Sequence, residues 1–285
     1  MHCVVMLHGL GANELEFIRI SKELHATGFS VVVPRIEGYA FDTSVQPWKS
    51  WVEQVQSQYW ELEKTYSSVS IVGLSMGAIL AMVLAQRQST PITGLVLLSA
   101  SLAYDGWSMP WYRRLLEISA WLPFASRYTM KESEPFGVKN EEMRAAIKSA
   151  LKSKDVAESG ADVLGYALIK EGQMLIREAR DNMHLIECPT LIVHSVDDEI
   201  VHIRNAEWAF KKIRSVDKEI IYLGDSYHMI TIDNERETVN QETIRFLQKV
   251  VNSQFEKPVF EVAPIKSSQM RRLLRKIQEQ VFQFN

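Results

Sequence analysis

Short apolar runs alternate with helical patterns along this chain, and this alternation restricts the folds that it can adopt. Six β-branched runs read as strands, at residues 4–7, 30–33, 69–72, 95–98, 191–193 and 219–223. Helical patterns cover about residues 15–27, 48–66, 76–88, 205–213 and 235–252. The apolar runs are continuous, which is typical of strands buried on both faces of a parallel sheet. We therefore expect a doubly wound α/β sheet with right-handed crossovers.

The alternation fails between residues 101 and 187, where we expect no strand. This stretch carries an aromatic-rich helical pattern at residues 107–121 and a charged one at residues 140–151. An insertion of this length is better explained as a helical cap over the sheet than as a loop. Its twelve Lys and Arg balance thirteen Asp and Glu, so a basic docking face is not indicated. The predicted domains are a core of residues 1–100 and 188–256, a cap of residues 101–187, and a C-terminal extension of residues 257–285.

The C-terminal extension differs from the rest of the chain. Pro258 and Pro264 interrupt it, and apolar residues at helical spacing follow, with arginines and a lysine among them: Met270, Leu273, Leu274, Ile277, Val281 and Phe282, and Arg271, Arg272, Arg275 and Lys276. Such an amphipathic basic helix either docks on its own domain or on a second subunit, or it binds a membrane surface or another partner. The sequence leaves both interpretations open.

Charge and cysteine content narrow the class of protein. The net charge of −3 gives no general affinity for nucleic acid. Cys3 and Cys188 are the two cysteines, far apart in the sequence, so a disulfide framework is not expected and a reducing cytoplasm is. The opening apolar run is short and lacks a basic segment before it, and no stretch approaches the ~20 apolar residues of a membrane span. We expect a cytoplasmic protein without a membrane span.

A serine follows the third apolar run at a tight turn. The motif GLSMG at residues 73–77 separates this run from an apolar helical pattern. By itself the motif is weak evidence, because a serine there could simply cap a helix. A strand-to-helix turn of this kind, however, strains the serine backbone and exposes its hydroxyl at the carboxyl end of the sheet. We predict that Ser75 is a nucleophile.

A serine nucleophile needs a base and an acid that orients the base. The histidine of GDSYHM, His228, follows the last apolar run and is the predicted base. After residues 191–193 the acids Asp197, Asp198 and Glu199 compete for the orienting role. Four other histidines are expected at the surface or at helix caps: His2, His25, His184 and His202. His194 is expected to be buried with its hydrogen bonds satisfied.

These residues resemble the α/β-hydrolases, and within them the bacterial carboxylesterase and monoacylglycerol lipase group. The resemblance covers residues 4–247 and rests on HGLGAN, GLSMGA, VDDEIV and DSYHMITIDNER in the order of that family. It implies a mostly parallel central sheet of six or seven strands flanked by helices, with a helical cap. The leading antiparallel strands of the family are missing or reduced, and Ala78 stands where a glycine is common.

The resemblance also implies roles for particular residues. It selects Asp198 as the triad acid and leaves Asp197 to hold its loop or to face solvent. The HGLG turn is implied to supply the backbone amide of Leu10 to an oxyanion hole, with the amide of Met76 as second donor. No metal or other cofactor is needed for this chemistry, and no ligand spacing or phosphate-binding glycine loop is present.

The aromatic stretch of the insertion has two possible roles. It either forms the core of a helical hairpin or supplies an apolar acyl pocket above Ser75. For the second role we single out Trp107, Trp111 and Tyr112.

The predicted function is hydrolysis of carboxylic esters, short- to medium-chain acyl esters or monoacylglycerols, through an acyl-enzyme. The predicted partner is a small-molecule ester, with a possible dimer contact or surface association through the C-terminal helix. One alternative is an ester or thioester hydrolase acting on a carrier protein, as in the pimeloyl methyl ester esterases. A catalytically silent binding module is the other alternative. The sequence does not specify the acyl chain or the alcohol.

Overall fold

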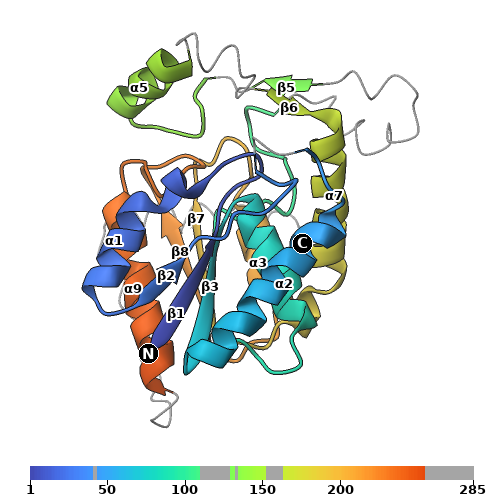
Figure 1. Ribbon diagram of the computed structural model, residues 1–285. Coiled ribbons are helices and arrows are strands. Elements are labelled where there is room, and N and C mark those ends of the chain that lie inside the picture. The colour runs from blue at the N-terminus through green and yellow to red at the C-terminus, as the bar shows by residue number, and fades with distance from the viewer. Residues whose placement is uncertain (41–43, 110–128, 132–133, 152–162, 254–285) are drawn as a thin grey trace, which may run out of the picture. The chain divides into compact units, whose positions relative to one another are not determined.

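A parallel sheet of six strands is the centre of the computed structural model, which describes residues 1–40, 44–109, 129–131, 134–151 and 163–253 (Figure 1). Contacts divide the chain into a unit of Met1–Val251 and a unit of Asn252–Asn285. The predicted basic helix of residues 257–285 lies outside the described residues, so both of its proposed roles stay predictions.

The sheet confirms the predicted strands. Their order is β2-β1-β3-β4-β7-β8, and each neighbouring pair is parallel. The strands are β1 (His2–Leu7), β2 (Ser30–Val32), β3 (Ser68–Leu74), β4 (Leu95–Leu98), β7 (Thr190–Ser195) and β8 (Lys218–Leu223).

Successive residues of each central strand serve opposite faces of the sheet. In β1, Val5 and Leu7 belong to one apolar core, while Val4 and Met6 belong to the other. This division explains why the strands are apolar throughout, since both faces are covered by helices. The first core contains residues of α2 (Trp48–Thr65), α3 (Met76–Arg87) and α8 (Arg204–Lys212), and the second contains residues of α1 (Ile18–Ala26) and α9 (Arg236–Ser253). In Figure 1, α1 and α9 lie on one side of the sheet and α2 and α3 on the other.

The insertion between β4 and β7 differs from expectation in two ways. The expectation of no strand there is wrong, because β5 (Thr129–Lys131) and β6 (Val163–Gly165) form an antiparallel pair. Strands of three residues are too short to leave a period in the sequence. A helix that the sequence analysis did not identify, α7 (Tyr166–Asp181), packs against α2 and α3 and contributes Leu175 to the first core.

The rest of the insertion includes the expected charged helix, α5 (Glu141–Leu151), and a short 3-10 helix, η3 (Met183–Leu185). Figure 1 shows α5, β5 and β6 beyond the carboxyl ends of the central strands. The aromatic pattern at residues 107–121 lies largely outside the described residues. The division into a core of residues 1–100 and 188–256 and a cap of residues 101–187 therefore stays a prediction.

The topology reverses next to β1. The chain passes from β1 to β2 on one side and then to β3 on the other, so the ends of β1 and β3 are adjacent. In open α/β sheets, ligands bind at the carboxyl ends of the strands beside such a switch point. The turns after Leu7 and Leu74 meet at this place.

Candidate active site

Ser75 occupies a strained turn between β3 and α3. Its backbone has φ 56° and ψ −117°, and residues other than glycine rarely adopt such a positive φ. A Cβ on Gly73 would lie 2.4 Å from the carbonyl oxygen of Gly77, so the turn closes only with glycine at that position. The amide of Ser75 donates to the carbonyl oxygen of Leu98 at 2.9 Å, which fixes the turn to β4. The serine side chain is thereby held at the end of the sheet.

Ser75, His228 and Asp198 lie in one chain of hydrogen bonds, although they come from three separate loops. The Nε2 atom of His228 is 2.9 Å from the Oγ of Ser75, and its Nδ1 is 2.8 Å from Oδ2 of Asp198. The second carboxylate oxygen of Asp198 accepts from the amides of Ile200 and Val201 at 2.9 and 2.8 Å. The carboxylate orientation is therefore fixed by its own loop.

Charge and burial together set the protonation states of His228 and Asp198. Burial lowers the pKa of His228, but the charge of Asp198 and the hydrogen bond to it outweigh burial, and the pKa is raised above its usual value. Burial raises the pKa of Asp198, yet the charge of His228 and their hydrogen bond bring it below the usual value. Asp198 thus stays ionised while the imidazole becomes a stronger base.

The other two acids of the loop have different surroundings. Asp197 is exposed, and its carboxylate pairs with Nζ of Lys139 at 2.8 Å. Glu199 is buried, and its Oε2 accepts from the backbone amide of His228 at 3.1 Å. Burial raises the pKa of Glu199 above its usual value. Of the three candidates, Asp198 is the acid that contacts the imidazole ring.

His194 approaches the same oxygen of Asp198 that His228 contacts. Its Nε2 lies 2.9 Å from the carbonyl oxygen of Val201 and 3.4 Å from Oδ2 of Asp198. Its Nδ1 is buried without a hydrogen-bond partner among the described residues. The expectation that the buried ring is hydrogen-bonded therefore holds for Nε2 and not for Nδ1. Burial lowers the pKa of His194, which keeps the ring neutral beside His228.

The HGLG turn is held by its neighbours. The hydroxyl of Tyr39 donates to the carbonyl oxygen of His8 at 2.7 Å, and the amide of Gly11 donates to the carbonyl oxygen of Tyr39 at 3.0 Å. The amide of Gly9 donates to a carboxylate oxygen of Glu16 at 2.8 Å. The Leu10 amide between them has no hydrogen-bond partner within the described part of the chain. The Met76 amide is the first of α3, where no intrahelical acceptor exists.

The side chains of Leu10 and Met76 converge on α7. A Cβ on Gly172 would lie 3.1 Å from Cδ2 of Leu10 and 3.3 Å from Cε of Met76. Gly172 was not among the residues expected from the sequence, because the helix that carries it was not predicted. Its missing side chain lets Leu10 and Met76 pack closely against α7.

A second serine missed by the sequence analysis touches Ser75. The buried Oγ of Ser101 lies 3.0 Å from the Oγ of Ser75. Its place three residues after the end of β4 is the signal that could have identified it, since β4 neighbours β3 in a parallel sheet.

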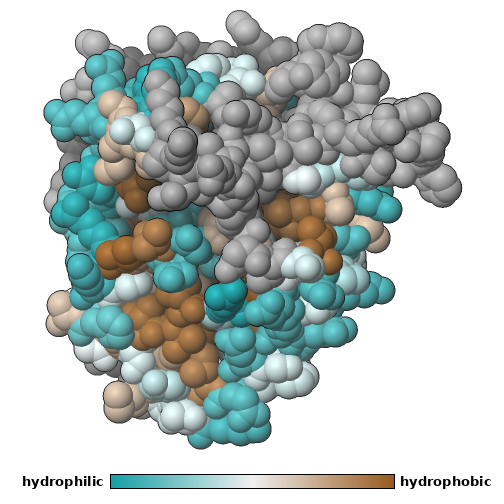
Figure 2. Space-filling view, turned by 45° about the horizontal axis from the view of Figure 1, so that its top comes forward, coloured by the Kyte–Doolittle hydropathy of each residue, from teal (hydrophilic) through white to brown (hydrophobic). Residues whose placement is uncertain are grey.

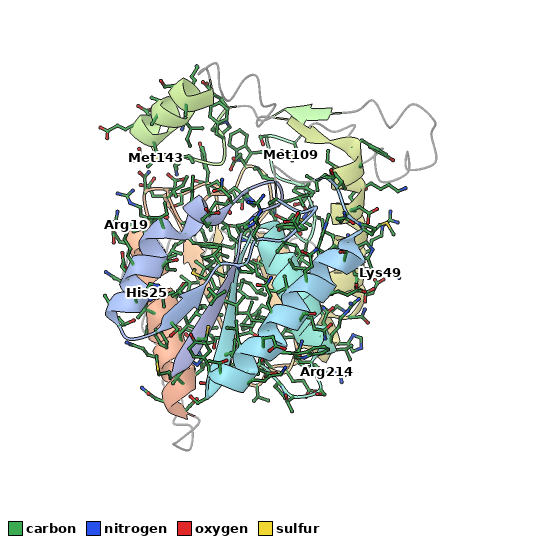
Figure 3. All side chains as sticks on the ribbon, viewed as in Figure 1. Arg19, His25, Lys49, Met109, Met143 and Arg214 are labelled. Atoms are coloured by element: carbon green, nitrogen blue, oxygen red, sulfur yellow. The ribbon has the colours of Figure 1, made fainter. Side chains whose placement is uncertain are left out.

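The predicted pocket residues are described only in part. Trp107 is 64% exposed, donates from Nε1 to the carbonyl oxygen of Asp197 at 3.3 Å, and packs edge-on against Tyr227. Trp111 and Tyr112 lie outside the described residues, so their role stays a prediction. Figure 3 shows Met109 and Met143 at the end of the molecule where the insertion lies, with Arg214 at the opposite end.

One minor expectation is wrong. His2 was expected at the surface or at a cap, but it is buried in β1, where Nδ1 lies 2.6 Å from the Oγ of Ser68. Burial lowers its pKa to about 4.

The described residues contain no group of three or more His, Cys, Asp and Glu placed to hold a metal ion. Their helices include none that is both long and apolar enough to cross a membrane. On the face shown in Figure 2, hydrophobic surface forms separate patches among polar side chains.

Comparison with known proteins gives consistent matches. A model of the family Hydrolase_4, described as serine aminopeptidase S33, matches residues 1–236. A carboxylesterase of Bacillus subtilis (strain 168) is 24% identical over 255 residues, which cover 87% of this chain and 92% of the relative. A thermostable monoacylglycerol lipase of Bacillus sp. (strain H-257) is 26% identical over 249 residues, 86% of this chain and 90% of the relative.

A solved structure extends the likeness to the fold. A soluble variant of the monoglyceride lipase from Saccharomyces cerevisiae, in complex with a substrate analogue, superposes with a TM-score of 0.73. The alignment covers 87% of this chain and 86% of that one at 16% identity. The fold is thus that of the α/β-hydrolases, and the resemblance stated from the sequence is confirmed.

Proposed function

The chain belongs to the serine aminopeptidase S33 family of hydrolases, and from this premise we propose that Ser75, His228 and Asp198 are the catalytic triad of an ester hydrolase. The chain is a carboxylic ester hydrolase, as the carboxylesterase and the monoacylglycerol lipase that it resembles indicate. The observation that carries the triad is the continuous hydrogen-bond chain from Ser75 through His228 to Asp198. The strained backbone of Ser75 supports its role as the nucleophile.

Acylation is the first half of the proposed reaction. Ser75 Oγ attacks the ester carbonyl carbon while its proton passes to Nε2 of His228. The carbonyl electron pair moves to the oxygen, which accepts hydrogen bonds from the amides of Leu10 and Met76; each such donor is worth roughly 3 kcal/mol in comparable sites. When the carbonyl reforms, the bond to the alcohol breaks and His228 protonates the leaving oxygen.

Deacylation repeats these steps with water. His228 accepts a proton from a water molecule that attacks the acyl carbon, and the second tetrahedral intermediate releases the carboxylic acid. The proton on His228 returns to Ser75. Throughout, Asp198 holds the imidazole in one tautomer and stabilises its protonated form.

The substrate class is the finer part of the proposal. The side chains of Leu10 and Met76 pack against α7 at Gly172, where the missing Cβ lets them approach the helix closely. Apolar side chains next to a serine nucleophile suit the acyl chain of an ester. Short- to medium-chain esters or monoacylglycerols are accordingly the proposed substrates, in line with the names of the relatives.

A cytoplasmic location is also proposed. Cys3 and Cys188 are both buried and free, so the described fold contains no disulfide. Burial raises the pKa of both thiols, to about 11 for Cys3 and about 12 for Cys188, which keeps them protonated and unreactive. Free cysteines of this kind are usual in a reducing compartment.

The test is hydrolysis of p-nitrophenyl esters of increasing acyl length by the wild-type chain and by Ser75→Ala. Ser75→Ala is expected to lose nearly all turnover and to keep its folded circular dichroism spectrum. Ser70→Ala is the matched control, because Ser70 is buried in β3, the strand that precedes Ser75, and its hydroxyl has no partner among the described residues. Wild-type turnover by Ser75→Ala would remove the proposed triad.

A further inference from the structure

The loop that carries His228 is joined to residues 137–140 of the insertion, here called the strap, through the buried carboxylate of Asp233. Oδ2 of Asp233 accepts from the amides of Lys139 and Tyr227, both at 2.7 Å. Oδ1 accepts from the amides of Asn140 and Asn234 at 2.8 and 2.9 Å. Asp233 is fully buried. Each of its carboxylate oxygens accepts from one amide of the strap and from one amide of the histidine loop, and so links the two segments.

The strap also forms a hydrogen bond with Met229, the residue that follows His228. The amide of Met229 donates to the carbonyl oxygen of Gly137 at 2.8 Å. Gly137 has φ +74°, and a Cβ on it would lie 2.6 Å from Cγ of Met229, so strap and loop are in close contact. Hence the strap holds the residues on both sides of His228, while the amide of His228 itself donates to Glu199.

Lys139 extends the junction to the loop of Asp198. Its Nζ pairs with Asp197 at 2.8 Å and with Asp225 at 3.3 Å. Asp197 directly precedes Asp198, and Asp225 lies three residues before His228. One strap residue thus bridges the two loops that carry the proposed acid and base.

We propose that Asp233 and Lys139 are positioning residues through which the strap sets the reach of His228 toward Ser75. This inference rests on the proposed triad, because it concerns the placement of its base. Displacement of a catalytic group by about 1 Å lowers rates by up to about 100-fold, so the support of this loop affects turnover. A movement of the strap would reach His228 through the amides of Tyr227 and Met229.

The test compares three variants by kcat per active site, with sites counted by labelling with a fluorophosphonate. Asp233→Asn keeps the size of the side chain but places an NH2 group against two of the four amides. Lys139→Met removes the two ion pairs and leaves the backbone contacts. Glu235→Gln is the matched control, because Glu235 accepts from the amides of Gly224 and Asp225 in the histidine loop and does not belong to the junction.

We expect kcat per labelled site to fall about tenfold to 100-fold in Asp233→Asn, and less in Lys139→Met. The acid limb of kcat/KM should move to lower pH in both variants, as contact with Asp198 loosens. The charged or titratable groups that face His228 are Asp198, Glu199, Glu16 and His194, and all of them remain in the variants. Glu235→Gln should keep wild-type kcat per site and the wild-type limb.

Wild-type kcat per site and an unchanged acid limb in both junction variants would overturn the inference. An equal loss of kcat per site in Glu235→Gln would overturn the inference too. It would mean that any weakening of the histidine loop lowers kcat, whether or not the junction is involved. If Asp233→Asn does not fold, Lys139→Met decides, because Lys139 is partly exposed and its removal leaves the core intact. Labelling or turnover that survives Ser75→Ala would refute the triad instead, which separates failure of the proposed function from failure of this inference.

Discussion

A Cβ atom on Gly77 would lie 1.9 Å from the carbonyl oxygen of Leu7, so the first turn of α3 packs directly against the end of β1. This contact joins the GLSMG turn to the HGLG turn, which are far apart in the sequence. Because the obstructing atom belongs to the backbone, it cannot move aside as a flexible side chain would. The approach of the two turns depends on glycine at this position.

Gly77→Ala is therefore expected to destabilise the fold by about 1–3 kcal/mol or more and to lower turnover. The extra methyl group would push α3, and with it Ser75, away from the HGLG turn. Thermal unfolding and p-nitrophenyl acetate hydrolysis measure the two effects. Gly165→Ala serves as the control, because a Cβ there would meet no heavy atom within 4 Å. A wild-type Tm and rate for Gly77→Ala would show that the contact is not tight.

The pH dependence follows from the raised pKa of His228. A base must be unprotonated to act, so activity should fall as the pH drops through the pKa of His228, which lies above the usual value of about 6.5. The midpoint of the acid limb of kcat/KM is the quantity to measure. A rate that is flat between about pH 5 and 8, with chemistry limiting, would argue against a histidine base.

Asp198→Asn should move that midpoint downward. The charge and the hydrogen bond that raise the pKa of His228 would be lost, and burial, which lowers it, would remain. In the well-studied serine protease triad the same change lowers kcat about 10⁴-fold. Asp197→Asn is the comparison, because Asp197 is exposed and pairs with Lys139 instead of the imidazole. A larger effect at Asp197 than at Asp198 would reverse the assignment of the acid.

Tyr39→Phe tests whether the HGLG turn must be held in place. The change removes the hydrogen bond from the Tyr39 hydroxyl to the carbonyl oxygen of His8, at a cost of about 1–3 kcal/mol if that oxygen is left buried and unpaired. A turn that is less fixed should lower kcat more than it raises KM, since oxyanion contacts form in the transition state. Tyr66→Phe, at the end of α2, provides the control. Unchanged kcat in Tyr39→Phe would mean that the turn holds without this bond.

Gly172→Ala tests the close packing of Leu10 and Met76 against α7. Alanine adds up to about 1 kcal/mol of helix stability relative to glycine, and the two contacts are with ends of flexible side chains, so Tm should stay or rise. The displaced side chains of Leu10 and Met76 should move toward the proposed acyl site, so that kcat/KM falls more for octanoate than for acetate p-nitrophenyl esters. Equal changes for both esters would place the acyl chain elsewhere.

The sequence predicted the elements best where local pattern and tertiary environment agree. Strands buried on both faces are apolar throughout, and all six apolar runs coincide with strands of the sheet. The helix predicted at residues 48–66 is observed as Trp48–Thr65 for the same reason, since its apolar face lies on the sheet. Within the insertion this agreement ends. There the three-residue strands β5 and β6 carry no period, and α7, which follows β6 directly, packs on the helices α2 and α3.

The parallel α/β sheet and the meeting of a serine, an acid and a histidine at its edge follow from sequence pattern, because parallel strands place the carboxyl ends of β3, β7 and β8 at the same edge. Among the three neighbouring acids the family resemblance selects Asp198, and the contact of Asp198 with His228 is seen only in the structure, since it depends on how one loop turns its carboxylates. Only the structure showed Ser101 beside Ser75, Gly172 beside Leu10, and Asp233 between the strap and the histidine loop. Contacts of this kind join residues far apart in the chain, and no local pattern of side chains encodes them.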